Sequence, residues 1–342
     1  MSLSPPCLFE IILKINGRES HHGWRASFDS PGSFPGQESP GRTHPRVLSM
    51  SLLGQLSFKL PRLGFVFQGI KKLSALPSNI DKQTSILQHQ FIEQLLAQPR
   101  YNDPKRLHRF EHQVYSQNGE DGALDEIFRR IGSTSRVFLE IGVGDGLENN
   151  TTHFLSQGWK GFWVDGDQKA LERIQKIFWQ PLGRGDLMVQ QALVTAENIG
   201  EVLAKMKVPA EFDLFSLDID RNTYFIWQAL KHLRPRVVVI EYNSTYPPQV
   251  DWKVEYRPNM VYNCTSYMGA SLKAYERLGG ELGYALVGCD LCGINAFFVR
   301  RDLCANHFAE PFTAENHFEP PRYFLMRRDG HPRCFTDIPP NG

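Results

Sequence analysis

Short apolar runs alternate with amphipathic stretches through the central part of this chain. The first five runs are rich in Val, Ile, Leu and Phe, as are strands that are covered on both faces of a parallel sheet. They are Val137–Ile141, Gly161–Val164, Leu187–Leu193, Phe212–Leu217 and Val237–Ile240. Between them apolar residues recur at helical spacing, for example at Leu171, Ile174 and Phe178. This alternation predicts βαβ units.

Two further runs, Tyr284–Val287 and Asn295–Arg300, are joined only by the short Cys289–Ile294 segment. A parallel connection needs about a dozen residues or more, so we expect an antiparallel hairpin at one edge of the sheet. The sequence therefore predicts an α/β fold of the Rossmann-like type, with a mostly parallel seven-stranded sheet and helices on both faces. In the dinucleotide dehydrogenase topology the last strand stays parallel, which this hairpin excludes.

The flanking segments differ in composition from this centre. Residues 16–49 are rich in Gly, Pro, Ser and His, and we expect disorder because they cannot bury enough apolar surface to offset the entropy of ordering. A translation start at Met50 would explain this extension. Leu87, Phe91 and Leu95 recur four apart before Pro99, which predicts an amphipathic helix. We therefore divide the chain into a disordered extension (1–49), a helical segment (50–114), a central domain (115–301) and a tail (302–342).

The overall composition excludes several kinds of partner. Lys and Arg total 38 against 37 Asp and Glu, which gives no electrostatic basis for binding nucleic acid or an anionic membrane. No run approaches the roughly 20 apolar residues of a membrane-spanning helix. Six cysteines without a signal peptide indicate reduced thiols and a cytoplasmic location. Cys289 and Cys292 lack the second short-spaced pair typical of structural zinc, so we expect no metal there.

The most distinctive local motif is the Gly142–Gly146 turn, Gly-Val-Gly-Asp-Gly, directly after the first strand. Glycines let the chain turn sharply and bring backbone N–H groups close to a ligand. The G-x-G-x-G spacing differs from the G-x-G-x-x-G turn that places a pyrophosphate at a helix N-terminus. S-adenosylmethionine has no phosphate and therefore fits this turn better. Glu140, just before it, can attract the positively charged amino group of the methionine part.

An acidic residue near the end of the second strand is expected to accept hydrogen bonds from a ribose diol. Asp165 lies nineteen positions after Gly146, which fits this role. We expect the turn and Asp165 to hold opposite ends of one adenosyl ligand, although a Gly-rich turn taken alone is also compatible with a purely structural role. The predicted cofactor-binding residues are Glu140, Gly142, Gly144, Asp145, Gly146, Asp165 and Asp218.

Asp218 and Asp220 follow the fourth predicted strand, where an open α/β sheet binds its ligands. Three interpretations stay open. Asp218 can line the methionine side and the reacting centre, or the Asp-x-Asp pair can hold a hard divalent cation. Alternatively, Asp220 caps a helix over Thr223–Leu233.

Three further features can contribute to a site. Glu241 follows the fifth strand and is a candidate for substrate contact, or else pairs with a nearby arginine. His153, seven positions after the Gly-rich turn, is a candidate general base or a helix-core residue. The insertion Thr245–Met268, rich in Tyr and Trp, has the length of a substrate loop or lid, although its aromatic residues can also simply pack on the sheet edge.

Together these residues resemble the FkbM-like group of class I methyltransferases. The resemblance covers about Tyr115 to Arg301, and its most specific element is the Ser-Gln-x-Gly-Glu-Asp segment over Ser116–Asp121. Its other matching segments are Glu140–Gly146, Gly158-Trp159 leading to Asp165, Ser216–Asp220, Gly288-Cys289 and Asn295–Arg300. Arg221 and Thr223 depart from that group, which has Gly and an acidic residue at these places.

The resemblance implies a methyltransferase fold and O-methylation of a hydroxyl on a small-molecule acceptor, including sugars, with S-adenosylmethionine as cofactor. Asp218 would then lie beside the methyl group. The candidates for the base that takes the hydroxyl proton are Asp218, Glu241 and His153, in that order. The alternatives are a catalytically inert nucleoside-binding module and a metal-dependent Asp-x-Asp glycosyltransferase.

Overall fold

The computed structural model describes residues 80–258, 260, 264–325 and 331–337. All of them belong to one structural unit, Lys72–Gly342. The predicted disorder of residues 1–49, the proposed start at Met50 and the helical prediction for residues 50–79 lie outside the described residues.

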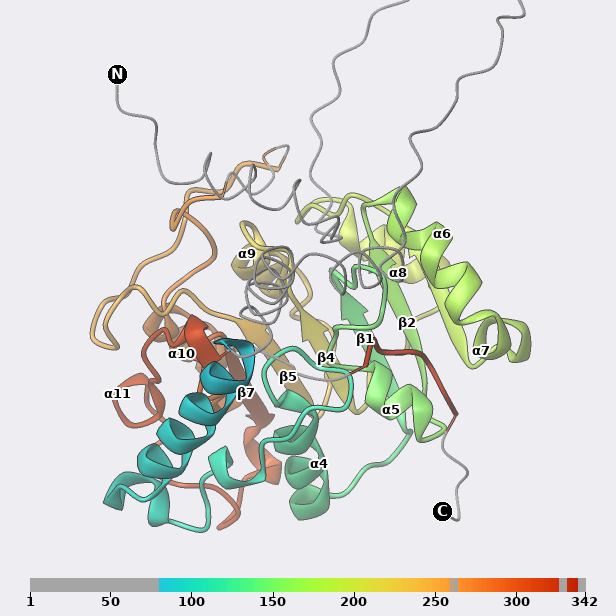
Figure 1. Cartoon of the computed structure of the whole chain (residues 1–342). Helices are drawn as coiled ribbons and strands as arrows, with labels where there is room; N and C mark the ends of the chain where they lie inside the picture. Colours follow the sequence, from blue (N-terminus) through green and yellow to red (C-terminus); the bar gives the residue numbers. More distant parts are fainter. Residues whose placement is uncertain (1–79, 259, 261–263, 326–330, 338–342) are drawn as a thin grey trace, which may run out of the picture. The chain divides into compact units, whose positions relative to one another are not determined.

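Seven strands form one sheet in the order β3-β2-β1-β4-β5-β7-β6 (Figure 1). They are β1 (Val137–Ile141), β2 (Lys160–Asp165), β3 (Leu187–Gln191), β4 (Leu214–Leu217), β5 (Val237–Glu241), β6 (Tyr284–Cys289) and β7 (Asn295–Arg300). The first five strands pair in parallel, whereas β7 is antiparallel to both β5 and β6. This confirms the predicted Rossmann-like methyltransferase fold, including the hairpin that places β6 at one edge.

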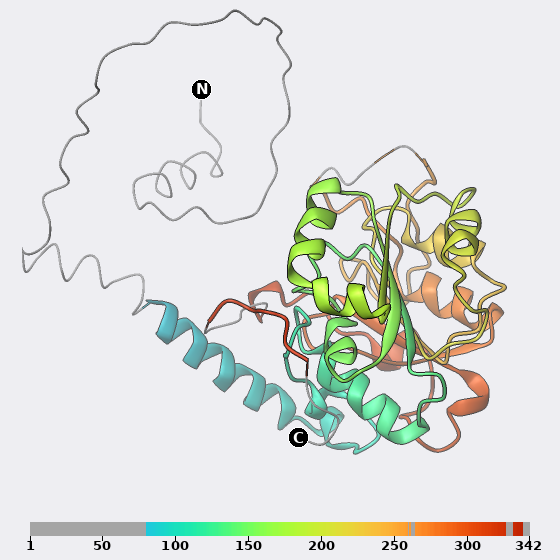
Figure 2. The same cartoon turned by 90° about the vertical axis from the view of Figure 1, so that its right-hand side faces the viewer.

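Helices cover both faces of the sheet, as Figure 2 shows. They are α4 (Glu120–Ile131), α5 (Thr152–Ser156), α6 (Gln168–Ile177), α7 (Trp179–Arg184), α8 (Ile199–Met206), α9 (Thr223–Ala229), α10 (Leu272–Glu281) and α11 (Ala314–His317). The short 3₁₀ helices are η1 (Pro99–Asn102), η2 (His108–Phe110), η3 (Arg301–Leu303) and η4 (Tyr323–Leu325). Within the described residues, no helix combines the length and apolar character that crossing a bilayer requires.

The strands supply two separate hydrophobic clusters, because successive side chains of a strand point to opposite faces. Leu139 belongs to the cluster that includes residues of α8, α9 and α10. Its neighbour Phe138 belongs to the other cluster, which includes residues of α4, α5 and α6. Burial on both faces explains why the strands are almost entirely apolar in sequence.

Segments outside residues 115–301 pack on the same core. Leu107, Cys304 and Phe308 belong to the cluster that contains Phe138. Glu319 is buried, accepts a hydrogen bond from the Tyr101 hydroxyl at 2.8 Å and forms ion pairs with Arg100 and Arg322 at 2.9 and 2.8 Å. The described segments before and after the predicted domain are therefore joined to each other as well as to the sheet.

Residues 80–96 form the predicted N-terminal helix. Its apolar side is covered only in part, since Leu95 is buried while Leu87 is 64% exposed. Phe91 contacts the Phe324 ring, with a centroid distance of 5.3 Å.

Candidate active site

The Gly-rich turn lies directly against the chain that leaves β4. Gly142 has a φ of 85°, and a Cβ atom at this position would lie 1.6 Å from the carbonyl oxygen of Asp218. Only glycine permits this approach. Gly144, with a φ of 61°, has no atom within 4 Å of the place where a Cβ would be. The turn therefore packs on Asp218 on one side and is open at Gly144.

Asp165 meets the turn directly. Its Oδ2 accepts hydrogen bonds from the backbone N–H groups of Val143 and Gly144 at 2.9 and 2.8 Å, and its Oδ1 accepts from the N–H of Asp167 at 2.8 Å. A carboxylate has about four acceptor positions, so about one remains, on Oδ1. The expectation that the turn and Asp165 hold opposite ends of a ligand needs correction, because these two N–H groups are bonded to Asp165 itself.

Glu140 is enclosed by the protein. Its Oε2 accepts from the Asn149 amide at 2.7 Å and the Thr151 hydroxyl at 2.5 Å, and its Oε1 accepts from the Asn150 N–H at 3.0 Å and the Ser216 hydroxyl at 2.9 Å. Burial raises its pKa to about 7, although these hydrogen bonds act in the opposite direction. The predicted contact with a cofactor amino group is wrong in this geometry, because internal donors fill all four acceptor positions. Glu140 instead holds the segment after the turn against β4.

Asp145 and His153 occupy other positions near the turn. The Oδ1 of Asp145 accepts from the N–H of Leu147 at 3.2 Å, and its Oδ2 lies 3.7 Å from Arg173. His153 is buried on α5, with its Nε2 2.8 Å from Asp125. Burial lowers the pKa of His153, but the hydrogen bond and charge of Asp125 outweigh this effect and raise it.

His153 belongs to a cluster that does not include Asp218 or Glu241. The ligand atoms of His112, Asp125 and His153 lie within 4.8 Å of one another. His153, the third candidate base, is therefore not in the same group as Asp218 and Glu241. Its partner Asp125 instead makes it a member of a separate His–Asp group.

Three carboxylates converge where β4 and β5 end. Leu217 pairs with Ile240 in the parallel register, so Asp218 and Glu241, each one residue further on, are neighbours across the two strands. Asp218, Asp220 and Glu241 each place one oxygen within 4.8 Å of the others. The Asp-x-Asp motif thus joins a third carboxylate that follows a different strand.

Asp220 does not cap α9. That helix begins at Thr223 with Asn222 at its N-cap position, and no side chain caps it. Asp220 has a left-handed φ of 59° in a tight turn in which the N–H of Arg221 donates to the carbonyl of Ile219 at 2.7 Å. The N-cap interpretation is wrong because this turn separates Asp220 from the start of the helix.

The electrostatics of the three carboxylates favour one protonated member. Burial raises the pKa of Glu241 well above its ordinary value, and the charges of Asp218 and Asp220 add to the effect. Burial and then the charge of Asp218 raise the pKa of Asp220 to about 6. Asp218 is the most exposed of the three; crowding by protein raises its pKa, while hydrogen bonding to Glu241 opposes the rise. We therefore assign the proton to Glu241 and the negative charge to Asp218.

No Lys, Arg or His among the described residues forms an ion pair with these carboxylates. The alternative in which Glu241 pairs with an arginine is therefore not found in the part of the chain that the structure describes. The group contrasts with Glu126 and Glu319, which are buried with arginine partners.

Several buried polar atoms around this edge have no hydrogen-bond partner among the residues that the structure describes. They are Arg221 Nε, Asn222 Oδ1, Glu241 Oε2, Ser244 Oγ and the Tyr275 hydroxyl. Buried polar groups are normally paired, so their concentration around the ends of β4 and β5 indicates a place that ligand or water atoms complete. The sequence gives no signal for Tyr275, which lies among the apolar residues of α10.

Arg221 is unusual within this group. It is only 4% exposed, yet its guanidinium makes no ion pair or hydrogen bond among the described residues, and it lies over the Tyr267 ring at 5.1 Å. Tyr267 comes from the insertion, and its ring contacts Trp252, which in turn stacks on Tyr246 at 4.3 Å. Much of the aromatic content of the insertion therefore packs on itself, while Tyr267 adjoins the site. Tyr262 lies outside the described residues.

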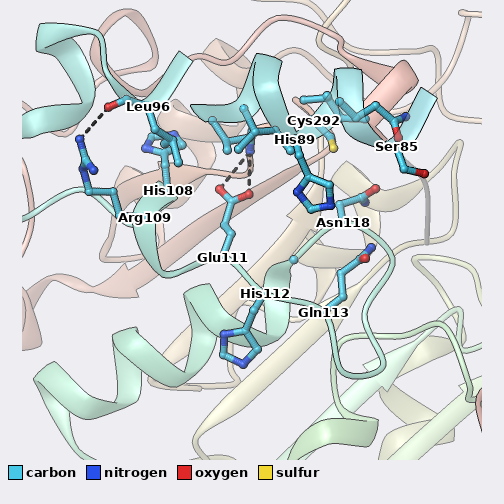
Figure 3. Close-up of a pocket in the computed structure, with 15 residues that line it drawn as sticks. Ser85, His89, Leu96, His108, Arg109, Glu111, His112, Gln113, Asn118 and Cys292 are labelled. Carbon is cyan, nitrogen blue, oxygen red and sulfur yellow. Dashed lines mark hydrogen bonds between the residues drawn. The ribbon is translucent and has the colours of Figure 1, made fainter. Parts of the chain in front are cut away.

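A separate pocket of about 600 Å³ lies elsewhere, between helix 80–96 and the segment before α4 (Figure 3). Its lining includes His108, Glu111, Asn118 and Cys292. Figure 3 shows the Glu111 carboxylate directed at a backbone N–H, which belongs to Leu291 at 3.0 Å. None of the predicted cofactor or catalytic residues lines this pocket.

The known proteins to which this chain is similar are only distantly similar in sequence. No protein-family model and no curated protein matches this chain. Among solved structures, the methyltransferase domain of bacterial CtHen1-C is 15% identical, with a TM-score of 0.33 over 53% of this chain and 97% of that domain. The glycopeptide N-methyltransferase MtfA, complexed with S-adenosyl-L-methionine, is 13% identical, with a TM-score of 0.34 over 55% and 96%. TrmK of M. capricolum, in complex with S-adenosyl-homocysteine, is 14% identical, with a TM-score of 0.32 over 55% and 69%.

Proposed function

We propose that this protein is an S-adenosylmethionine-dependent methyltransferase that methylates a hydroxyl group of a small-molecule acceptor, including sugars. The observation that carries this proposal is the contact between Gly142 and the backbone of Asp218. This contact supports the proposal because the turn expected to bind the cofactor lies against the backbone of the residue expected to take a proton. The proposed cofactor site and the proposed base are therefore adjacent in the structure.

The arrangement of the turn supports an adenosyl ligand. Asp165 is bonded to the turn N–H groups that a pyrophosphate would need, and its negative charge opposes a phosphate there. The remaining acceptor position on Asp165 Oδ1 suits a ribose hydroxyl. The open face at Gly144 gives the ligand room beside the turn.

Methyl transfer is an in-line displacement from a sulfonium. The acceptor oxygen forms a bond to the methyl carbon, the carbon–sulfur bond breaks, and the sulfur leaves as a neutral thioether. Alignment of the reactants can lower the barrier by about 7–11 kcal/mol. Asp218 takes the hydroxyl proton, a contribution of about 10²–10⁴-fold, while protonated Glu241 stabilises the charge on Asp218. We assign no role in this step to His153, because it belongs to the separate group with His112 and Asp125.

We also propose membership in the FkbM-like group. Asp121 Oδ2 accepts from the N–H groups of Val114, Tyr115 and Ser116, and Glu120 accepts from the Asn295 amide at 2.6 Å. The Ser-Gln-x-Gly-Glu-Asp segment is therefore bonded to the start of β7, another segment of the resemblance. This hydrogen bond supports the proposal, because two segments of the resemblance that lie far apart in sequence contact each other.

Titration calorimetry with S-adenosylmethionine and S-adenosylhomocysteine tests the cofactor assignment. We expect micromolar binding that Asp165→Ala weakens at least tenfold, with the exposed Glu172→Ala on α6 as the control that leaves it unchanged. Release of labelled methyl groups to a panel of hydroxyl acceptors then tests turnover, which Asp218→Asn should remove while cofactor binding remains. Cofactor binding without turnover would identify an inert module, and absence of cofactor binding would refute the proposal.

A further inference from the structure

The carboxylates of Asp218, Asp220 and Glu241 form a group without a counter-charge among the described residues. One oxygen from each lies within 4.8 Å of the other two. Oxygens at such a spacing, held on the ends of two paired strands, repel one another when charged. The register of β4 and β5 keeps them together despite this repulsion.

A second observation points to an occupant of this group. Tyr275 is fully buried on α10, and its hydroxyl has no hydrogen-bond partner in the described part of the chain. The hydroxyl lies beside the Asp220 segment, since a Cβ atom at Gly269 would lie 3.9 Å from the Tyr275 hydroxyl and 3.4 Å from the carbonyl oxygen of Asp220. The Oε2 of Glu241 is likewise shielded and unpaired. A bound ion with its coordinated water molecules would supply partners to both atoms, whereas an empty site leaves both unsatisfied.

We propose that Asp218, Asp220 and Glu241 bind one divalent cation of the Mg²⁺ or Mn²⁺ class. All three donors are carboxylate oxygens, which hard cations prefer over the nitrogen and sulfur ligands of zinc and copper sites. Around an octahedral Mg²⁺, neighbouring oxygens lie about 3.0 Å apart and opposite oxygens about 4.2 Å apart. The three carboxylate oxygens, which lie within 4.8 Å of one another, would therefore close by up to about 1.8 Å to coordinate one ion. Three protein ligands leave about three of the six positions open.

The open coordination positions of the cation favour one class of acceptor, an inference that rests on the proposed methyltransferase function. A cation beside the cofactor turn favours acceptors with two adjacent oxygens, such as a vicinal diol or a hydroxy acid, that can both reach it. Glu241 would hold the cation in its ionised form, so binding of the cation would release the proton assigned to Glu241 in the ion-free site. Coordination of the acceptor would favour loss of its hydroxyl proton to water, the oxygen would form a bond to the methyl carbon, and the carbon–sulfur bond would break. Simple alcohols with one oxygen would be poor acceptors.

Binding of Mn²⁺ to the full chain, stripped with EDTA and followed by electron paramagnetic resonance, tests the site without any knowledge of the acceptor. We expect one Mn²⁺ per chain, displaced by excess Mg²⁺. Asp218→Asn and Glu241→Gln should each weaken Mn²⁺ binding at least tenfold. Asp125→Asn is the control, since it alters the separate His112–Asp125–His153 group and should leave Mn²⁺ binding unchanged.

A measurement on the unaltered protein covers the case in which a variant does not fold. Fe²⁺ with ascorbate and peroxide cleaves the backbone near a bound metal, and we expect fragments that end near Asp218 and Glu241. No stoichiometric Mn²⁺ binding, binding unaffected in folded Asp218→Asn and Glu241→Gln, or cleavage confined to the His112 group would overturn the proposal. Titration with S-adenosylmethionine in EDTA separates the two ideas: cofactor binding without a metal site leaves the proposed function standing, and a metal site without cofactor binding leaves only the metal proposal.

Discussion

Glu140→Gln should change how the stability of this protein depends on pH. In the folded chain, burial raises the pKa of Glu140 from its ordinary value of 4.5 to about 7. The folded state therefore holds this proton more tightly than the unfolded state does. Between these two pKa values the folded state binds more protons, so the free energy of unfolding falls as pH rises.

The magnitude follows from the two pKa values. Their difference, 7 minus 4.5, is about 2.5, which corresponds to about 3.4 kcal/mol at 1.36 kcal/mol for each pKa unit. This stabilisation is present below about pH 4.5 and is lost as pH rises through about 7. Glutamine cannot ionise, so the variant lacks this part of the pH dependence. The hydrogen bonds to Glu140 oppose the rise in its pKa, and their effect is already contained in the value of about 7.

Urea unfolding at several pH values from 4.5 to 8 measures the effect. We expect the difference in unfolding free energy between the wild type and Glu140→Gln to change by about 3 kcal/mol across this range, in favour of the variant at high pH. Taking the difference cancels groups common to both proteins, including Glu241 and Asp220. Glu172→Gln, an exposed change on α6, should run parallel to the wild type. If the Glu140→Gln and wild-type profiles are also parallel, the carboxyl does not carry a raised pKa and the reasoning fails.

Three further substitutions test other parts of the structure. Gly142→Ala places a methyl carbon 1.6 Å from the Asp218 carbonyl oxygen, so we expect a loss of at least about 3 kcal/mol in urea unfolding; a loss below about 1 kcal/mol would contradict the close contact. Arg221→Met removes a buried charge that has no ion-pair or hydrogen-bond partner among the described residues, so the variant should be as stable as the wild type in thermal unfolding or more stable by about 1 kcal/mol. Clear destabilisation would show that stacking on Tyr267 dominates. Asp121→Asn weakens three hydrogen bonds from backbone N–H groups, so we expect the free energy of unfolding in urea to fall by about 1.5–3 kcal/mol. A variant as stable as the wild type would contradict this expectation.

The sheet could be predicted from sequence because its strands are apolar on both faces. β1 and β7 have the predicted bounds, Val137–Ile141 and Asn295–Arg300. Errors occur where a strand leaves the covered region: β3 ends at Gln191 rather than at Leu193, which is 60% exposed. Burial alone does not decide the ends, because Phe212 is buried and yet β4 begins at Leu214, where pairing with β5 begins.

The site could be predicted only where it depends on strand ends. Asp218 follows β4 and Glu241 is the last residue of β5, and the parallel pairing of those strands brings the two residues together. The contacts of Glu140 could not be predicted, because its donors include Ser216, 76 positions away on another strand. The sequence gives no indication that Tyr275 belongs to the site, because a buried tyrosine on an amphipathic helix is usually a packing residue.

The pairing of Leu217 with Ile240 has a consequence beyond the stability of the sheet. A slip of one residue between β4 and β5 would turn one of the two following carboxylates toward the opposite face. Chemistry at this edge is thus as sensitive to strand alignment as to the identity of the acidic residues. Core substitutions in β4 or β5 that leave every polar side chain intact can therefore abolish activity.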